Sequence, residues 1–223
     1  MMYKTHKEVG KVFFIVSLPI AIQTGLIPSI FSSMGNGVVQ TLKTLIYLIT
    51  TLVVGYHGAI WGAGYPDLDS QGSTPDRRNP ILGKIIRAFG VKHRGKFSHS
   101  LDSITLTFGI VLLTVRNLLP LVILNSAFKD IAIVELFLKN GIINGLVQVW
   151  IMFAYVGAIS HLFGDASTKS GIRIFFFLKP FRIVPNMRFF RTGDDSIWEK
   201  FYRDLFKVLI PISVLSTLYV LLK

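Results

Sequence analysis

The chain has 223 residues, of which 51% are hydrophobic and 16% charged, with a formal net charge of +12 and no cysteine. A mean hydropathy of +0.55 is too high for an ordinary soluble domain, and the length predicts one domain over residues 1–223. The lack of cysteine excludes disulfides, thiolate metal sites and cysteine nucleophiles.

Five apolar segments predict membrane-spanning helices, because a helix needs ~20 residues to cross a hydrocarbon core of ~30 Å. In chain order they cover residues 12–31, 42–64, 101–124, 141–163 and 205–222. The first is predicted as a retained helix, because Pro19 interrupts it and no A-x-A-like signal-peptide cleavage site follows. Arg116 and Pro120 interrupt the third, which is either one kinked span or a shorter helix followed by an interfacial piece. The prediction is an all-α polytopic membrane protein with about five transmembrane helices.

Basic residues are concentrated in alternate connections between these segments. Three Lys precede the first span, and Lys and Arg are frequent in residues 77–96 and 169–203, whereas residues 32–40 contain none. The positive-inside rule then places the N-terminus and both long basic loops in the cytoplasm. Basic loops also suit anionic lipid headgroups. The expected partner is therefore the lipid bilayer, and no nucleic acid is expected.

Residues of metal-ligand type recur at the predicted cytoplasmic ends of the apolar segments. His161 and Asp165 are spaced i,i+4 and so share one helix face. Asp67 and Asp69 flank Leu68 after Pro66, which favours an extended backbone before it, so that both carboxylates would point the same way. Taken singly, each pattern is also ordinary helix-end or turn chemistry. Their convergence on one membrane face predicts a metal site with seven ligands: His6, Asp67, Asp69, His93, His99, His161 and Asp165.

The pair His93 and His99 surrounds Gly95, which allows the chain to bend sharply. Ser98 and Ser100 are predicted to orient the imidazoles, although a basic interfacial loop that happens to contain two histidines has the same pattern. Imidazole and carboxylate together suit Zn, Mn, Fe or Ni rather than Ca or Mg. The predicted cofactor is a divalent metal, first of all zinc, with two or more ions.

Candidate residues for substrate binding and for proton transfer lie beside these ligands in the sequence. Arg94 and Lys96 are predicted to bind an anionic substrate group, or else anchor the loop at the interface. A metal ion can bring the pKa of bound water to ~7, and Asp69 or Asp102 could accept the proton. His57 lies inside the second span and stays outside the metal set. The sequence has no nucleophile elbow, P-loop or dinucleotide fingerprint.

Four blocks carry a resemblance to a known family: Thr5-His6, the segment from Pro66 to Ser70, the segment from His93 to Ser100, and the segment from Ser160 to Thr168. In this order, with hydrophobic spans between them, the chain resembles the YdjM-like family of membrane-bound metal-dependent hydrolases, whose best-known member is LexA-regulated. The resemblance covers residues 5 to about 171 and continues more loosely through Thr192-Gly193 to Glu199. It implies that the seven residues above are metal ligands in a bacterial inner-membrane protein. His57 has no counterpart in the family pattern, and Arg116 is unusual there.

The order His, Pro-Asp, His, His-x-x-x-Asp is also similar to that of zinc-dependent phospholipase C enzymes and related nucleases. This more distant likeness implies a phosphoester substrate such as a phospholipid. The favoured function is therefore a membrane-bound metal-dependent hydrolase of a phosphoester or lipid-like substrate. Two alternatives stay open at this point. One is a metal-ion transporter or sensor, whose ligands would lie near the bilayer midplane. The other is a membrane scaffold with a coordinatively closed structural metal.

Overall fold

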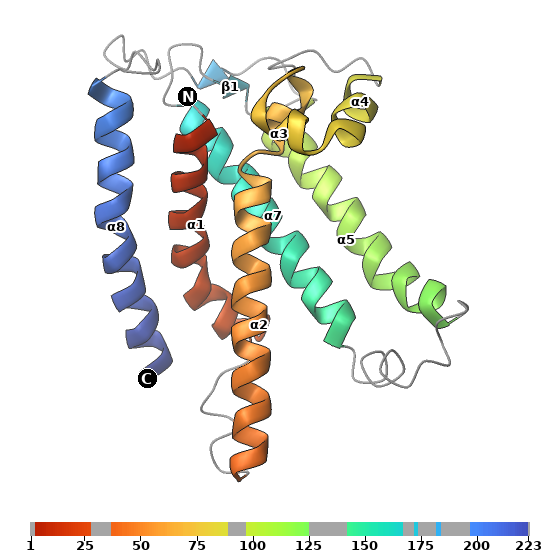
Figure 1. The fold of residues 1–223 in the computed structure, drawn as a ribbon, viewed down its shortest axis with the longest axis vertical. Helices are drawn as coiled ribbons and strands as arrows, with labels where there is room; N and C mark the ends of the chain where they lie inside the picture. Colours follow the sequence, from red (N-terminus) through yellow and green to blue (C-terminus); the bar gives the residue numbers. More distant parts are fainter. Residues whose placement is uncertain are drawn as a thin grey trace.

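Five long helices form the body of the protein in a computed structural model, which describes residues 3–27, 37–88, 97–124, 142–166, 172–173, 182–183 and 197–222. These helices are α1 (Tyr3–Gln23), α2 (Val38–Gly62), α5 (Leu101–Leu124), α7 (Ile142–Ala166) and α8 (Ile197–Leu222). They run lengthwise through the molecule (Figure 1). The predicted all-α fold is confirmed, and α5 continues without a break past Arg116 and Pro120.

Short elements gather at one end of the long helices, the end at which the described part of α1 begins (Figure 1). They are the 3₁₀ helix η2 (Pro66–Asp69), α3 (Thr74–Arg78), α4 (Pro80–Ala88) and the strands β1 (Ile172–Arg173) and β2 (Arg182–Ile183). The two strands pair antiparallel over two residues each. This end of the molecule therefore contains the described parts of the connections that were predicted to be cytoplasmic.

Three helices among the described residues are long and apolar enough to cross a membrane: α2, α7 and the part of α5 from Leu101 to Leu118. The prediction of about five spans was therefore somewhat too high. The first turns of α1 are charged, with Lys4, Lys7, Glu8 and Lys11. In α8, the backbone is described throughout, but several side chains are not among the described ones. Large apolar side chains such as Val53 (63% exposed) and Leu113 (59%) face outward, as a lipid environment requires.

The central contact joins α2 to α7 through glycines. A Cβ atom at Gly62 would overlap the Ala154 carbonyl, and one at Gly157 would overlap the Ala59 carbonyl. Small residues at such crossings let helix backbones approach closely in a membrane protein. Gly10 of α1 fits against the same place, because a Cβ there would lie 2.9 Å from that of Ala63. The ends of α1, α2 and α7 are thus drawn together.

Two apolar clusters hold the elements around the site, and a third, with Val9 and Val12, lies between α1 and α8. Phe14 and Phe153 pack edge-on, at 4.8 Å between ring centroids, in the cluster shared by α1, α2 and α7. Leu68 of η2 is buried with Ile104 of α5 and Leu162 of α7 in the second cluster. This second cluster holds η2 and the start of α5 against the end of α7, next to His161 and Asp165.

Candidate metal centre

His161 lies on the last turns of α7 and has a defined orientation. Its Nδ1 atom is 2.8 Å from the backbone oxygen of Ala63. Because a carbonyl oxygen can only accept, Nδ1–H is the donor, and the lone pair of a neutral ring is then on Nε2. The Gly157 crossing, one helical turn earlier, brings Ala63 within reach. The backbone of α2 therefore decides which nitrogen of His161 faces the cluster.

The Nε2 atom of His161 is buried and has no hydrogen-bond partner among the described residues. It lies 3.5 Å from Oδ2 of Asp165 and 3.8 Å from Oδ1 of Asp67. A buried lone pair that faces two carboxylates is repelled by both, and a proton or a metal ion at Nε2 removes that repulsion. A histidine whose far nitrogen is tied to a backbone carbonyl is also the usual arrangement of a metal ligand.

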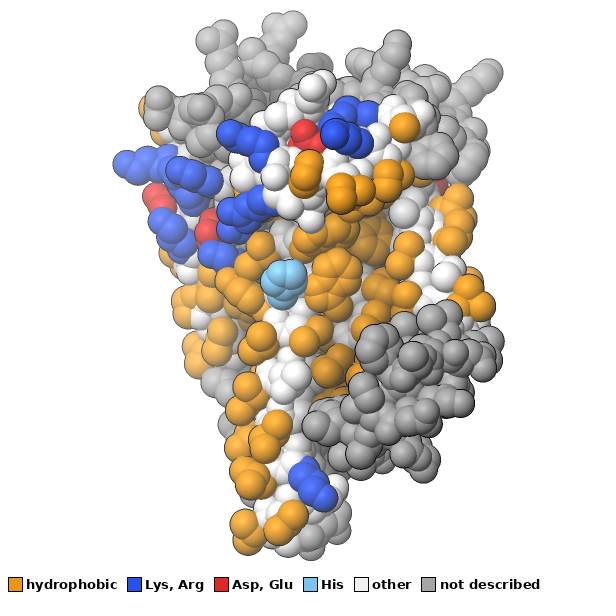
Figure 2. Space-filling model, turned by 45° about the vertical axis from the view of Figure 1, so that its right-hand side comes forward, with side chains coloured by type: hydrophobic (Ala, Val, Ile, Leu, Met, Phe, Trp, Pro, Cys, Tyr) orange, Lys and Arg blue, Asp and Glu red, His pale blue; other side chains and the backbone are white. Residues whose placement is uncertain are grey.

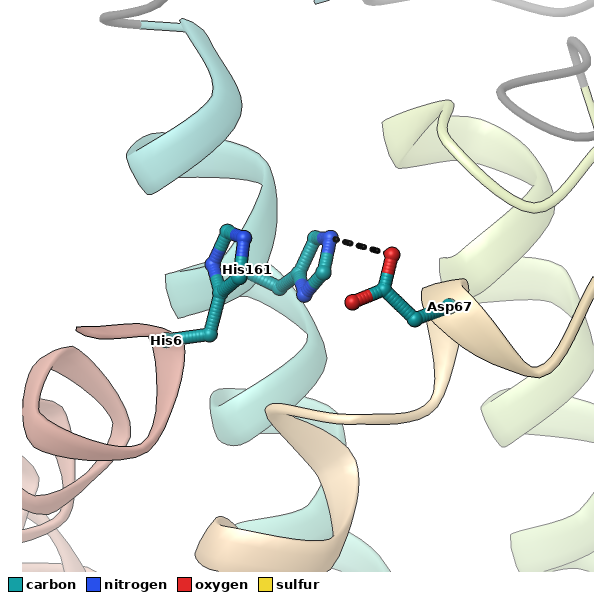
Figure 3. A group of neighbouring side chains, drawn as sticks. All are labelled: His6, Asp67 and His161. Atoms are coloured by element: carbon teal, nitrogen blue, oxygen red, sulfur yellow. Dashed lines mark ion pairs between the residues drawn. The ribbon is translucent and has the colours of Figure 1, made fainter. Parts of the chain in front are cut away.

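His6 reaches the same place from α1. Its ring stacks on that of His161, with 3.6 Å between centroids and 10° between planes, and its Nε2 is 3.3 Å from Oδ1 of Asp165. Burial first, and then the charge of His161, lower the pKa of His6 from 6.5 to about 4. His6 is therefore neutral at physiological pH, which is the form that binds metals. Figure 3 shows His6, His161 and Asp67 converging from three elements.

His99 approaches from the turn before α5. Its Nδ1 atom lies 2.9 Å from Oγ of Ser98, and its Nε2 lies 3.7 Å from Oδ2 of Asp165. Two groups of three ligand-type residues result, His6 with Asp67 and His161, and His99 with His161 and Asp165. Within each group the ligand atoms lie within 4.8 Å of one another. The two groups share His161, so they form one continuous cluster.

The two carboxylates of η2 point in different directions. Tyr65 is helical (φ −55°, ψ −47°) and Pro66–Asp69 is a 3₁₀ helix, so the predicted extended backbone was wrong. With three residues per turn, positions i and i+2 cannot share a face. Asp67 faces His161, whereas Oδ2 of Asp69 accepts a hydrogen bond from Ser98 and lies 3.5 Å from Nδ1 of His99. Asp69 thus has the position of a carboxylate that orients a ligand histidine.

The backbone of η2 is held by α3 and α4. Oγ of Ser73 donates to the Asp67 carbonyl at 2.7 Å, and Nη1 of Arg87 donates to the Leu68 carbonyl at 3.2 Å. Arg87 also bonds Oδ1 of Asp76 at 2.8 Å, while Oδ2 of Asp76 accepts from the Gly72 amide. The Gly72 amide first, and then Arg87, lower the pKa of Asp76 below 3.8. These contacts keep Asp67 and Asp69 in place.

Sequence reasoning missed Ser73, Asp76 and Arg87. Ser73 and Asp76 have the spacing of a helix N-cap, and in the structure Oγ of Ser73 does accept from the Asp76 amide. That signal could have located the start of α3. Arg87, however, reaches η2 only because α4 folds back on it, and nothing in the sequence indicates this contact.

Four other predicted site residues and His57 have different outcomes. His93, Arg94 and Lys96 lie outside the described residues. Asp102 is at the first turn of α5, where its Oδ1 accepts the amide of Ser103 at 2.9 Å, and it belongs to neither ligand group. His57 is exposed on α2, and its Nδ1 accepts a hydrogen bond from Nε1 of Trp150 at 2.9 Å.

A family model described as YdjM inner membrane protein matches residues 1–222. The chain belongs to the YdjM inner membrane protein family. The predicted family resemblance and the predicted inner-membrane location are therefore confirmed, in agreement with the three apolar helices. No curated protein and no solved structure matches the chain. Membership in the YdjM family gives the location, and the chemistry has to be argued from the cluster.

Proposed function

We propose that this YdjM family member is a metal-dependent hydrolase that acts on a phosphoester of a lipid-like substrate at the cytoplasmic face of the inner membrane. One observation carries the proposal. The buried Nε2 of His161 faces two carboxylates, with its other nitrogen committed to a backbone carbonyl. A divalent cation would satisfy His161, Asp67 and Asp165 together, whereas a single proton would satisfy only one pair.

The donor set fits such an ion. It combines imidazole nitrogens and carboxylate oxygens with no thiolate, which suits Zn, Mn, Fe or Ni. Because Nε2 carries the only free lone pair of His161, that residue would bind one ion, either with His6 and Asp67 or with His99 and Asp165. A second ion would be held without His161. A bound divalent ion supplies a strong Lewis acid and makes water acidic enough to ionise near neutral pH.

The side chains of the cluster differ in their exposure to solvent. The side chains of His6, His161, His99 and Asp165 are at most 4% exposed, whereas that of Asp67 is 20% exposed. Water and substrate would therefore enter beside Asp67, where its carboxylate could accept a proton. Asp69 would orient His99 through Ser98. This positioning role is an addition to the ligand and base roles that the sequence predicts for Asp69. Asp102, the other predicted base, and the predicted phosphate contacts Arg94 and Lys96 remain to be tested by substitution.

The decisive experiment is metal analysis by mass spectrometry on detergent-purified protein, loaded with zinc and then dialysed. Wild type is compared with a His99→Ala, Asp165→Ala double variant and with His57→Ala as a control. We expect at least one equivalent of metal in wild type and in His57→Ala, and loss in the double variant. A phosphoester screen with the loaded protein then tests hydrolysis. Wild-type protein that holds no metal would overturn the proposal.

A structural metal site is the second candidate, because the deep burial of His6, His161 and Asp165 resembles a closed site. Substitution of Asp67, the partly exposed residue, distinguishes the two functions. Asp67→Ala should abolish hydrolysis in an enzyme while most of the folded protein remains. In a scaffold there is no turnover to lose, and metal loss should instead lower the folded yield.

A further inference from the structure

A cavity lined by other residues lies next to the elements that carry the ligand groups. A cavity of about 350 Å³ opens where α3 meets α2 and α7, with Trp61, Leu68, Pro75 and Trp150 among its apolar lining residues. Arg78 and Asn79 line it as polar residues, together with Tyr3 and His57. None of these residues belongs to either candidate metal group. The cavity therefore has an apolar wall and a polar part that contains a cation.

The polar part of the cavity contains Arg78, which has no ion-pair partner among the described side chains. The guanidinium of Arg78 lies 5.9 Å from the centroid of the Tyr3 ring, and the ammonium of Lys7 lies 5.8 Å from the same ring. No carboxylate among the described side chains pairs with Arg78. A cation that is placed by an aromatic ring and lacks an acidic partner is suited to bind an anionic group.

The apolar part of the cavity includes side chains of two helices that are long and apolar enough to span a membrane. Trp61 and Trp150 pack with 5.0 Å between ring centroids, and the Trp150 indole is fixed by its hydrogen bond to His57. Both tryptophans belong to helices that are long and apolar enough to span a membrane. On the same α2, Ile49 and Val53 are more than half exposed. Figure 2 shows Lys and Arg side chains gathered above a broad hydrophobic face.

We propose that this cavity binds one anionic phospholipid of the inner membrane, with the phosphate at Arg78 and Asn79 and an acyl chain along Trp61 and Trp150. From α3 towards the middle of α2, the surface presents a cation, then an aromatic pair, then aliphatic side chains. Phosphate, glycerol and acyl chain follow one another in the same order in a bilayer leaflet. A soluble anion would satisfy Arg78 but leave the tryptophan-lined wall without a partner. The site does not depend on the proposed hydrolase activity.

Tryptophan quenching by brominated lipids tests this site. The protein is given a Trp198→Phe background, so that Trp61 and Trp150 are the remaining tryptophans, and is reconstituted in phosphatidylcholine vesicles. Brominated phosphatidylglycerol and brominated phosphatidylcholine are then titrated separately. We expect the anionic lipid to quench at a mole fraction about fivefold lower, the effect of roughly one Lys or Arg at a membrane surface.

Two single variants separate the cavity from general surface charge. Arg78→Gln should abolish the preference for the anionic lipid, whereas Arg77→Gln should keep it, because Arg77 neighbours Arg78 on α3 but does not line the cavity. Both side chains are exposed, and circular dichroism checks that both variants are folded. No preference in wild type, retention of the preference in Arg78→Gln, or an equal loss in both variants would each overturn the proposal.

Discussion

At the scale of single residues, the hydrogen bond from His161 to the Ala63 carbonyl fixes the orientation of the His161 ring. It leaves one nitrogen of the ring to face Asp67 and Asp165, and the stacked ring of His6 lies beside it. A stacked pair of imidazoles in a buried place would repel if both were protonated. The low pKa of His6, about 4, agrees with a neutral ring there.

Asp69 provides the sharpest residue-scale test, because it is placed behind His99 rather than in either ligand group. Asp69→Asn keeps the size of the side chain but removes its charge. We expect zinc affinity to fall by about 10- to 100-fold, the usual effect of losing a group that orients a ligand. A competition titration with a chromophoric chelator measures this, with Asp204→Asn, which removes an exposed carboxylate of α8, as the control.

Two results of that titration would contradict the positioning role. Unchanged affinity would mean that the contact with His99 is incidental. Complete loss of binding at saturating zinc would mean that Asp69 is itself a ligand, as its sequence pattern predicts.

Asp76 gives a pH-dependent prediction outside the spans. Its pKa is below 3.8 in the folded protein because the Gly72 amide and Arg87 stabilise the carboxylate. A lowered pKa contributes stability that is fully present above the unfolded-state value and is lost as the pH falls through the folded value. Asp76→Asn should therefore lower the melting temperature at pH 7. The difference from wild type should shrink as the pH falls below 3.8. A difference that is independent of pH would contradict this account.

At the scale of elements, the close crossing of α2 and α7 positions the metal candidates. Gly157 lies one turn before His161, and Gly62 directly precedes Ala63, whose carbonyl binds that histidine. Packing of the two backbones therefore decides whether the hydrogen bond forms. The crossing depends on the absence of side chains at these glycines.

Gly157→Ala tests this crossing. An added methyl would overlap the Ala59 carbonyl, so the helices must separate, with an expected loss of about 1–3 kcal/mol and weakened metal binding. Gly109→Ala in α5 is the matched control, because nothing lies within 4 Å of a Cβ at that position. Thermal unfolding and metal content are measured for both variants. If the two variants behave alike, the proposed coupling between packing and site is wrong.

The elements themselves were largely predictable, and their ends were less so. The apolar run at residues 101–124 matches α5, and those at 42–64 and 141–163 differ only slightly from α2 and α7. Long apolar runs have few alternatives to helix in a membrane. The 3₁₀ helix η2 was not predictable from Pro66, because its conformation continues from the end of α2 and is fixed by Ser73 and Arg87.

At the scale of the whole molecule, four sequence-distant segments meet at one end. The sequence predicted this convergence from the alternation of charge between the connections. It did not predict that His6 would stack on His161, or that Asp67 and Asp69 would face different histidines. Those details depend on packing of α1, α2 and α7 through Gly10, Gly62 and Gly157. The convergence of helix ends can thus be predicted from the sequence, but the geometry of the candidate site requires the fold.

Metal removal is the corresponding prediction for the whole molecule. An ion bound at the cluster would connect α1, η2, α7 and the turn before α5. Binding at about 1,000 times the dissociation constant adds ~4 kcal/mol to the free energy of unfolding. Chelation should therefore lower the melting temperature of the detergent-purified protein, and added zinc should restore it. A melting temperature that responds to neither treatment would rule out a bound ion that connects these elements.

The stacking of His6 on His161 also has a consequence for biosynthesis. The two rings belong to α1 and α7, and the ribosome makes everything between them before the second ring exists. At about 5–20 residues per second, synthesis of the segment between the two histidines takes about 8–31 seconds. The cluster can therefore form only after the chain has been synthesised to the end of α7. A nascent chain that stalls before α7 would lack both His161 and Asp165 and would be unable to retain the proposed ion.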